Sequence, residues 1–363
     1  MLPRVSSLPS QNSPSYPGHP GSVLPSGSEP GSLRIGVDLG GTKIESVVVR
    51  LPGSATTPGR LPEVLARTRR PTDRERGYEH IVNAVADSIW DVASQAGLSH
   101  DRLPPIGVGM PGAVTRAGVI KNSNTTCLNG RPFRGDLIRR VGEPIAFAND
   151  ANCFALAEAT FGAGRGHEVV FGVILGTGVG GGIVLPTPDF PLSPGLSRPM
   201  LGRSWNGPQG IAGEWGHVTI DPEGPPCYCG RRGCVETYLC GPALEADYRQ
   251  RSGQALPLRD IANAAQTGHD PHAIATLQNA TRWFGRALAT VINILDPDVI
   301  VLGGGVSLLD CWYDAGRTEV SRWVFTDELT TPIVRHQISD AAGVLGAALL
   351  PTLSPALPAL GSP

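Results

Sequence analysis

The sequence of 363 residues lacks any run of apolar residues long enough to cross a lipid bilayer, and its net charge is only −2. Such a balanced charge gives no support for a surface that binds nucleic acid or a membrane. Residues 1–32 also lack the basic start and the apolar run of a secretory signal. We therefore expect a cytoplasmic protein with reduced thiols, with neither nucleic acid nor a membrane as a partner.

No G-x-x-x-x-G-K-[ST] motif is present, which excludes a nucleotide site of the P-loop type. Residues 176–181 do match the G-x-G-x-x-G pattern of dinucleotide-binding proteins. That pattern must open a helix, but the residues that follow here, Gly-Ile-Val-Leu, are typical of a strand. Any nucleotide site must therefore be built from another kind of glycine turn.

Long apolar runs are lacking in two terminal segments, 1–32 and 351–363, which are rich in Pro, Ser and Gly. Segments of this composition cannot bury enough apolar surface to order themselves, so we expect a disordered leader and a flexible tail. A Pro-rich insert at 186–199 predicts a surface loop. The rest of the chain is long enough for two domains.

Short strand-like runs alternate with helical patterns along the remainder of the chain. The runs lie at 33–37, 44–49, 106–110, 144–148, 168–175, 182–185, 299–302 and 332–336, and helical patterns dominate 243–295. This alternation predicts the α/β class. We expect a small α/β lobe at 33–146, completed by a C-terminal helix at 341–350, and a large α/β lobe at 147–340. Thr72 and Asp73 are positioned to cap a helix that follows them.

Two segments of the chain resemble each other. IGVDLGGT (35–42) and FGVILGTG (171–178) share Gly, Val, Leu and Gly at the same offsets, and each predicts a strand, a glycine turn and a second strand. Backbone N–H groups at glycine turns can hold phosphate. Only the first copy has a carboxylate, Asp38, where the second has Ile174. One nucleotide–Mg²⁺ complex between two lobes fits this pattern, which favours a two-lobed, actin-like ATPase (ribonuclease H-like) fold.

A cysteine-rich segment offers a complete set of ligands for tetrahedral Zn²⁺: His217, Cys227, Cys229 and Cys234. One alternative is a pair of disulfides, which the odd total of seven cysteines and a reducing compartment disfavour. A purely structural zinc ribbon, without a role in catalysis, is the other. Two carboxylates, Glu214 and Glu236, flank the segment and predict a polar pocket beside the metal.

Asn149 and Asp150 stand where a predicted strand ends and a predicted helix begins. An aspartate at this place is commonly a helix cap. It is equally a candidate for a base that orients a substrate hydroxyl toward a phosphoryl group. The position by itself does not decide between the two roles.

Taken together, these motifs resemble the ROK family of bacterial sugar kinases. The matching pieces run in the family's order over 33–350: IGVDLGGTK (35–43), GVGMPG (107–112), NDANCFALAEA (149–159), LGTGVGGG (175–182), GEWGH (213–217), CYCGRRGCVE (227–236) and LGGG (302–305). Within the family the chain is most similar to fructokinases with mannokinase activity, through KNSNTTCLNGRPF (121–133), CYCGRRGCVETY (227–238), DYRQRSG (247–253) and NILDPDVIVLGGGVS (293–307). N-acetylglucosamine kinases and glucokinases of the family are the alternatives.

The resemblance implies transfer of the γ-phosphoryl group of ATP to a hexose hydroxyl, expected at C6, with Asp150 as the catalytic base. It assigns sugar contacts to Asn124, Asn149, Asp150, Glu214, His217, Glu236 and Gly112. It assigns nucleotide contacts to Gly40, Gly41, Thr42, Lys43, Gly176, Thr177, Gly178, Gly304 and Gly305, with Mg²⁺ bound through water by Asp38. Zn²⁺ bound by the four predicted ligands and a homodimer complete the expectation.

The chain departs from the family pattern at a few positions. Cys127 stands where close relatives often have Trp, and Cys240 stands where they place Ser. Both changes bear on the preferred hexose, and the insert at 186–199 has no assigned role. Two further functions are a transcriptional regulator and a zinc-stabilised sugar sensor. The regulators carry an N-terminal helix-turn-helix, which the composition of residues 1–32 does not favour.

Overall fold

The computed structural model describes residues 32–52, 60–99, 102–115, 117–186 and 202–353. The expected leader, the Pro-rich insert and the expected tail lie outside these residues except at their borders. At one border, the last helix reaches Leu353 and so includes the first residues of the expected tail. No helix in the described part of the chain is long and apolar enough to cross a membrane.

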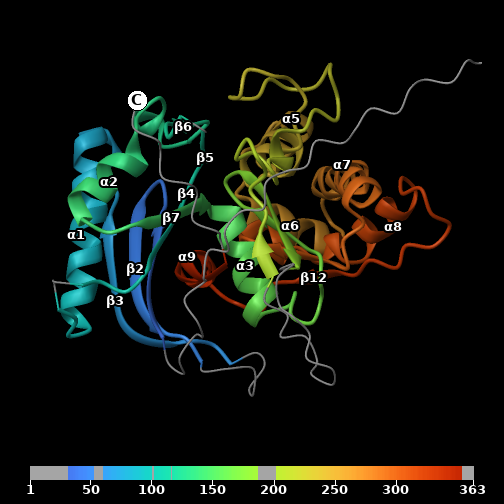
Figure 1. Ribbon diagram of the computed structural model, residues 1–363. Helices are drawn as coiled ribbons and strands as arrows, with labels where there is room; N and C mark the ends of the chain where they lie inside the picture. Colours follow the sequence, from blue (N-terminus) through green and yellow to red (C-terminus); the bar gives the residue numbers. More distant parts are fainter. Residues whose placement is uncertain (1–31, 53–59, 100–101, 116, 187–201, 354–363) are drawn as a thin grey trace, which may run out of the picture.

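The first sheet has the strand order β3-β2-β1-β4-β7. Its members are β1 (Leu33–Leu39), β2 (Lys43–Arg50), β3 (Glu63–Pro71), β4 (Ile106–Met110) and β7 (Ile145–Asn149). The β1–β2–β3 strands pair antiparallel, whereas β1, β4 and β7 run parallel. Helices α1 (Tyr78–Gln95) and α2 (Phe133–Val141) pack together beside this sheet, and α9 (Ala342–Leu353) packs on β1 and β4 (Figure 1).

The second sheet has the order β10-β9-β8-β11-β12 and repeats this layout. Its members are β8 (Val170–Leu175), β9 (Val179–Pro186), β10 (Gly202–Ser204), β11 (Val299–Gly303) and β12 (Ile333–Arg335). An antiparallel hairpin, β8–β9, is followed by parallel partners β11 and β12, as β1–β2 is by β4 and β7. The two similar sequence segments are thus equivalent hairpins of two related sheets, and the predicted two-lobed α/β fold is confirmed.

Two helices, α3 (Asp150–Phe161) and α9, pack against each other and join the two sheets. Glycine permits backbone contact at this junction. A Cβ on Gly107 of β4 would lie 1.9 Å from the carbonyl oxygen of Ala347 in α9. A Cβ on Gly346 would lie 1.8 Å from the carbonyl oxygen of Cys153 in α3. Because side chains would separate these elements, the glycines let β4, α9 and α3 pack backbone against backbone where the two sheets are joined.

The remaining helices pack on one another and lie on the side of the second sheet away from α9 (Figure 1). They are α4 (Glu236–Leu239), α5 (Gly241–Ser252), α6 (Leu258–Gln266), α7 (Pro271–Leu295) and α8 (Ala315–Ser321). Phe284 of α7 and Trp312 are fully buried against this sheet. A two-stranded sheet, β5 (Ala113–Val114) and β6 (Ile120–Lys121), extends from the end of β4.

The structure corrects the expected helix cap at Thr72 and Asp73. Helix α1 begins at Tyr78, after Gly77 and a 3₁₀ turn at Arg74–Arg76. Asp73 has a φ of 44° and its side chain caps nothing. The hydroxyl of Thr72 is used elsewhere, since it donates to the carbonyl oxygen of Gly40 at 2.7 Å. The sequence pattern predicts a cap because Thr and Asp are common helix caps, but the same residues are equally suited to a turn.

Two further differences concern strands. Strand β3 was not expected, because its sequence EVLARTRRP is polar; it pairs through one edge only, where a strand can remain exposed to water. Strand β7 still belongs to the first sheet and ends at Asn149, beyond the expected lobe boundary between 146 and 147. The chain therefore leaves the first sheet at Asn149–Asp150.

Candidate functional site

The turn between β1 and β2 is held by hydrogen bonds within the turn and from a neighbouring segment. Within it, the N–H of Gly40 donates to the carbonyl oxygen of Lys43 at 2.9 Å. From outside, Thr72 donates its backbone N–H to the oxygen of Thr42 at 3.0 Å, and its hydroxyl holds Gly40. This turn carries the first set of predicted phosphate contacts, and the clamp from Thr72 fixes its shape.

The turn between β8 and β9 lies against a carboxylate. The N–H of Gly176 donates to the oxygen of Gly178 at 2.9 Å, which closes the turn. Glu236, at the start of α4, accepts a hydrogen bond from the N–H of Val179 at 2.9 Å. A Cβ on Gly178 would lie only 2.7 Å from Oε2 of Glu236. The predicted phosphate turn and a predicted sugar ligand are therefore direct neighbours.

The predicted adenosine contacts follow β11 and adjoin this second turn. Gly304 has a φ of 82°, and a Cβ there would lie 2.3 Å from the carbonyl oxygen of Leu175. Gly241, at the start of α5, donates its N–H to the oxygen of Gly176 at 2.8 Å. The ends of β8 and β11 and the beginning of α5 thus meet around Gly176.

Four carboxylates form a row that links the two turns. Burial, followed by the charge of Asp150, raises the pKa of Asp38 to about 7. Burial, and further along the row the charge of Glu214, raises the pKa of Asp150 to about 6. Burial and the charge of Glu236 raise the pKa of Glu214 in turn. The charge of Asp150 thus disfavours ionisation of Asp38, that of Glu214 disfavours ionisation of Asp150, and that of Glu236 disfavours ionisation of Glu214. All four carboxylates therefore lie in one acidic region.

Asn149 and Asp150 have different positions and hydrogen bonds at the start of α3. Asn149 is the N-cap: its Oδ1 accepts the N–H of Ala151 at 2.9 Å, and its Nδ2 donates to the oxygen of Gly112 at 3.2 Å. Asp150 occupies the first helical position, and one of its oxygens also accepts from Ala151, at 2.8 Å. Because Asn149 already caps the helix, capping does not by itself explain why an aspartate follows it.

Gly112 connects this point with the loop that carries Asn124. Gly112 has a φ of 84°, and a Cβ on it would lie 2.8 Å from the backbone N of Ser123. Asn124 follows Ser123 and is exposed. In the same loop, the thiol of Cys127 lies 3.7 Å from the carbonyl oxygen of Arg74. The loop therefore spans from Asn149 to the segment beside the first glycine turn.

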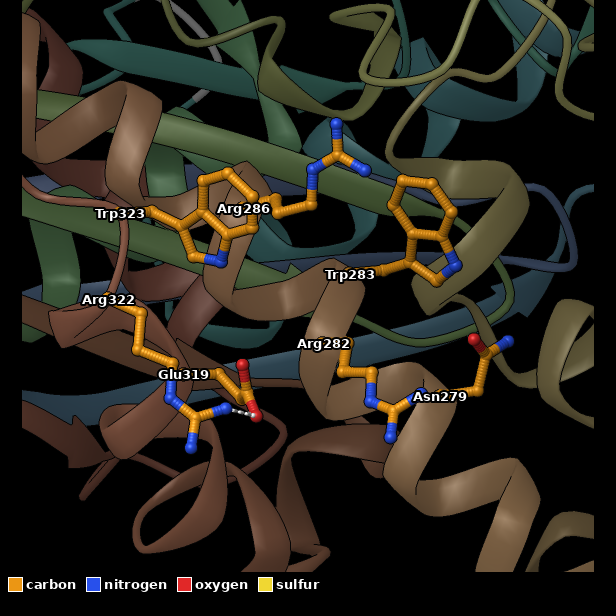
Figure 2. A pocket seen from close by; sticks show the side chains of 7 residues that line it. All are labelled: Asn279, Arg282, Trp283, Arg286, Glu319, Arg322 and Trp323. Carbon is orange, nitrogen blue, oxygen red and sulfur yellow. Dashed lines mark hydrogen bonds and ion pairs between the residues drawn. The ribbon is translucent and has the colours of Figure 1, made fainter.

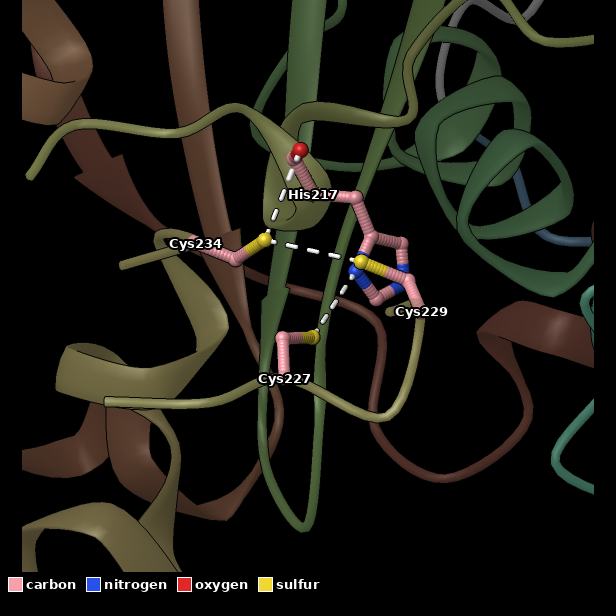
Figure 3. A group of neighbouring side chains, drawn as sticks. All are labelled: His217, Cys227, Cys229 and Cys234. Carbon is pink, nitrogen blue, oxygen red and sulfur yellow. Dashed lines mark hydrogen bonds between the residues drawn. The ribbon is translucent and has the colours of Figure 1, made fainter. Parts of the chain in front are cut away.

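The four predicted zinc ligands are brought together (Figure 3). The ligand atoms of His217, Cys227, Cys229 and Cys234 all lie within 4.8 Å of one another. Sγ of Cys227 is 3.5 Å from Nδ1 of His217, and Sγ of Cys229 is 3.6 Å from Sγ of Cys234. All seven cysteines are free, so the disulfide alternative is not realised. Three thiols and one imidazole nitrogen are a donor set that fits a tetrahedral Zn²⁺ site.

The imidazole of His217 has a partner that the sequence pattern did not indicate. With Nδ1 directed at the thiols, Nε2 lies 2.9 Å from the hydroxyl of Tyr228, and the two rings meet edge to face at 5.0 Å. His217, an expected sugar contact, is thus hydrogen-bonded through Nε2 to a tyrosine that is 62% exposed. A hydroxyl at this place in the loop is a second polar group beside the ring.

Sequence reasoning also missed Thr72 and Arg74. Thr72 clamps the first glycine turn, and Nη1 of Arg74 lies 3.7 Å from where a Cβ on Gly41 would be. A signal was present in the segment RPTDRER (70–76), whose Thr and Arg follow a Pro at the end of a strand. Only the pairing of β3 with β2 places that segment at the turn.

The described residues also form a separate groove, with a volume of about 390 Å³, on α7 and α8 (Figure 2). Its walls are Asn279, Arg282, Trp283, Arg286, Glu319, Arg322 and Trp323. A second hollow of about 320 Å³ continues it past Ala289 and Thr290. None of these residues belongs to the predicted site.

A family model, the sequences of known proteins and a solved structure all relate the chain to the same family. The model of the ROK family matches residues 34–352. The glucokinase of Thermotoga maritima is 30% identical over 332 residues, covering 86% of this chain and 95% of its own. The N-acetyl-D-glucosamine kinase of Pectobacterium atrosepticum is 32% identical, covering 87% and 97%. The crystal structure of the ROK hexokinase from Thermus thermophilus has a TM-score of 0.72 and 34% identity, covering 88% and 97%.

Proposed function

The chain belongs to the ROK family, and from this premise we propose that it is an ATP-dependent hexose kinase. The observation that carries the proposal is the row of Asp38, Asp150, Glu214 and Glu236 between two glycine turns. The names of its relatives, glucokinase, N-acetyl-D-glucosamine kinase and ROK hexokinase, support a sugar as the acceptor. Phosphoryl transfer asks a protein mainly for positioning and charge neutralisation. The two turns are suited to positioning, and the carboxylate of Asp38 to a metal that neutralises phosphate charge.

In the proposed reaction a sugar hydroxyl lies against Asp150. Its oxygen forms a bond to the γ-phosphorus of ATP, the bond from that phosphorus to the bridging oxygen breaks, and ADP leaves. The hydroxyl proton passes to the carboxylate of Asp150. A carboxylate with a pKa of about 6 is mostly ionised above neutrality and is a better proton acceptor than an ordinary aspartate.

The nucleotide is held by the two turns. Backbone N–H groups of the two turns, 40–43 and 176–178, position the phosphates, apart from those of Gly40 and Gly176, which close the turns. Gly304 and Gly305 leave room for adenosine. The carboxylate of Asp38 fits Mg²⁺ held through water, and the metal supplies positive charge to the phosphates when it is bound. A cation bound beside Asp38 and Asp150 also offsets the charge of Asp150, which together with burial raises the pKa of Asp38.

The zinc ligands support the sugar side of the site. With Zn²⁺ bound by His217 and the three cysteines, the loop would fix Glu214 on one side and Glu236 on the other. Together with Asn124, Asn149 and Gly112, these carboxylates form the proposed contacts with sugar hydroxyls. The metal's role in this proposal is structural.

The preferred hexose is the finer part of the proposal. Sequence motifs predict fructose, whereas the named relatives are a glucokinase and an N-acetyl-D-glucosamine kinase. The exposed loop around Asn124 and the half-buried thiol of Cys127 lie where the sugars would differ in their contacts. Preference for fructose stays a prediction, with glucose and N-acetylglucosamine as the alternatives.

A coupled assay of ADP release tests the proposal with fructose, mannose, glucose and N-acetylglucosamine as acceptors. We expect sugar-dependent and Mg²⁺-dependent ADP release with at least one hexose, and the highest kcat/KM with fructose. Absence of ADP release with all four sugars would contradict the kinase function. Sugar binding without ADP release would identify a sensor, and a band shift of DNA at physiological salt would identify a regulator.

A homodimer is the second part of the proposal, and the groove on α7 and α8 suggests its interface. Exposed apolar side chains gather beside it: Ile294 is 88% exposed, Trp323 50% and Phe325 98%. The guanidinium of Arg286 lies 4.9 Å from the ring centroid of Trp283 and 5.1 Å from that of Trp323. Trp, Phe and Arg are the residues that protein interfaces favour, and patches of this kind are rarely left open to water.

Charge along α7 makes this face complementary to a second copy of itself. Arg282 and Arg286 are exposed near the middle of the helix, whereas Asp296 is exposed at its C-terminal end. Small residues, Ala289 and Thr290, lie between them and line the second hollow. If two copies of α7 pack antiparallel across a two-fold axis at Ala289, Arg282 of each copy faces Asp296 of the other.

We expect Phe325→Asp to convert the dimer into monomers, because it places a charge in the apolar part of this face. Light scattering coupled to size-exclusion chromatography measures the mass. Leu61→Asp is the matched control, since Leu61 is an exposed apolar residue of the first lobe, at 51%. A monomeric wild-type protein, or an unchanged mass for Phe325→Asp, would contradict the interface.

A further inference from the structure

The proposed site is rich in carboxylates and poor in free positive charge. Lys43, the cation of the first glycine turn, has its ammonium 3.3 Å from Oε2 of Glu45. Glu45 is 1% exposed and also pairs with Arg67 and Arg69. Because the charge of a buried carboxylate must be compensated, these three cations are committed to Glu45. ATP therefore needs another cation on the protein besides its metal.

Arg74 is placed to be that cation. It begins the 3₁₀ turn that follows Thr72, the residue that clamps the first glycine turn. Its Nη1 lies 3.7 Å from where a Cβ on Gly41 would be, an ordinary van der Waals distance. The space that a Cβ would fill at Gly41 is thus open to an oxygen atom of a ligand. The guanidinium of Arg74 borders this space.

No carboxylate or other side chain pairs with the guanidinium of Arg74 among the residues that the structure describes. Its neighbour Arg76 differs, since Nη1 of Arg76 lies 3.9 Å from Oδ2 of Asp73. The backbone of Arg74 also contacts the sugar-side loop, because its carbonyl oxygen lies 3.7 Å from the thiol of Cys127. Arg74 therefore stands between the phosphate turn and the loop that carries Asn124.

We propose that Arg74 binds the terminal phosphoryl group of ATP and neutralises the charge that this group carries during transfer. The inference rests on the proposed kinase function. A guanidinium presents N–H groups in a planar fork that matches phosphate oxygens. Arginine in this role stabilises the transferred group more than the bound substrate, so it acts mainly on kcat. Arg74 takes part in no proton transfer, since the hydroxyl proton passes to Asp150.

Two substitutions and a control test the inference. Arg74→Ala is expected to lower kcat by about 10²-fold or more, and Arg74→Lys by about tenfold, because a lysine keeps the charge but loses the fork. The KM for the sugar should change less than about threefold, and the melting temperature should stay within about 2 °C, since the side chain is exposed and unpaired. Added guanidinium ion should restore part of the activity of Arg74→Ala. Arg76→Ala, on the same turn, should keep the wild-type kcat.

Binding measurements separate this inference from the kinase function. By calorimetry, Arg74→Ala should bind ATP more weakly by a larger factor than ADP, because only ATP has the terminal phosphoryl group. This result supports the inference even if no tested sugar is phosphorylated. If the wild-type enzyme is active and Arg74→Ala keeps its kcat within about threefold, the assignment of Arg74 is wrong while the kinase function stands. An equal loss of ATP and ADP affinity would also overturn it.

Discussion

Replacing Asp150 by Asn is expected to lower kcat by about 10²–10⁴-fold, the usual range for loss of a general base. The substitution keeps the size of the side chain and can still accept the hydrogen bond from Ala151 that Asp150 accepts at 2.8 Å. It removes the negative charge and, with it, the ability to take a proton. Since Asn149 remains as the N-cap, helix α3 should be retained.

A second aspartate provides the matched control. Asp270 caps α7 by accepting the N–H groups of His272 and Ala273, at 2.8 and 3.1 Å. Asp270→Asn therefore repeats the chemical change at a helix start outside the acidic row, and we expect its kcat to stay within about twofold of wild type. If Asp150→Asn behaves like Asp270→Asn, Asp150 is a structural residue of the helix start.

The melting temperature of Asp150→Asn is a second measurement, and the direction of its expected change follows from the raised pKa of Asp150. A carboxyl whose pKa rises on folding, here from 3.8 to about 6, favours the folded state fully below pH 3.8 and loses that contribution as pH rises through 6. Near pH 7.5 the ionised carboxylate is therefore unfavourable in the fold. Asp150→Asn should melt at the same temperature as wild type or higher at this pH, and the difference should shrink below pH 4. A lower melting temperature at pH 7.5 would contradict the buried, repelled carboxylate.

Activity should follow the same titration. For the free enzyme, kcat/KM for the sugar should rise as pH increases through about 6, because Asp150 must be ionised to accept the proton. A rate that does not change between pH 5 and 8 would show that a group with this pKa takes no part in the reaction.

Loss of the metal is expected to have the second large effect. Replacing Cys227 and Cys234 by Ser should abolish Zn²⁺ binding, lower the melting temperature by roughly 5–10 °C and remove measurable sugar binding. The physical reason is that the three thiols and the imidazole, whose ligand atoms lie within 4.8 Å of one another, are otherwise linked by long, weak sulfur hydrogen bonds of 3.5 to 3.6 Å. Without the metal, the loop that carries Glu214 and leads to Glu236 loses its anchor.

Elemental analysis and thermal unfolding, each with and without a chelator, measure this effect. Wild-type protein should contain one zinc per chain. Cys311→Ser is the control, since Cys311 is a free cysteine outside the cluster. ATP binding should be less affected than sugar binding, because the β1–β2 turn lies in the other lobe. Freshly purified wild-type protein without zinc, or a double variant that still binds sugar normally, would contradict the structural role of the metal.

Particular elements show how far sequence reasoning reached. The repeat of a strand, glycine turn and strand at 35–42 and 171–178 was sufficient to predict two related lobes, because glycine spacing and β-branched runs are local signals. Strand β3 was not predicted, because an edge strand can be polar throughout and then lacks an apolar pattern. The cap expected at Thr72 was wrong because the same side chains also suit turns. There, the neighbouring β1–β2 turn decided which hydrogen bonds formed.

The sequence by itself determined the α/β class, the paired glycine turns and the four candidate zinc ligands, because each depends on residue types at short spacing. Only the tertiary structure decided which distant residues meet. It placed Asp38, Asp150, Glu214 and Glu236 in one row, in which the pKa values of Asp38, Asp150 and Glu214 are raised, and it brought Arg74 to the turn at Gly41. Burial and charge repulsion depend on distances through space, which strand pairing and helix packing set and which no local pattern encodes.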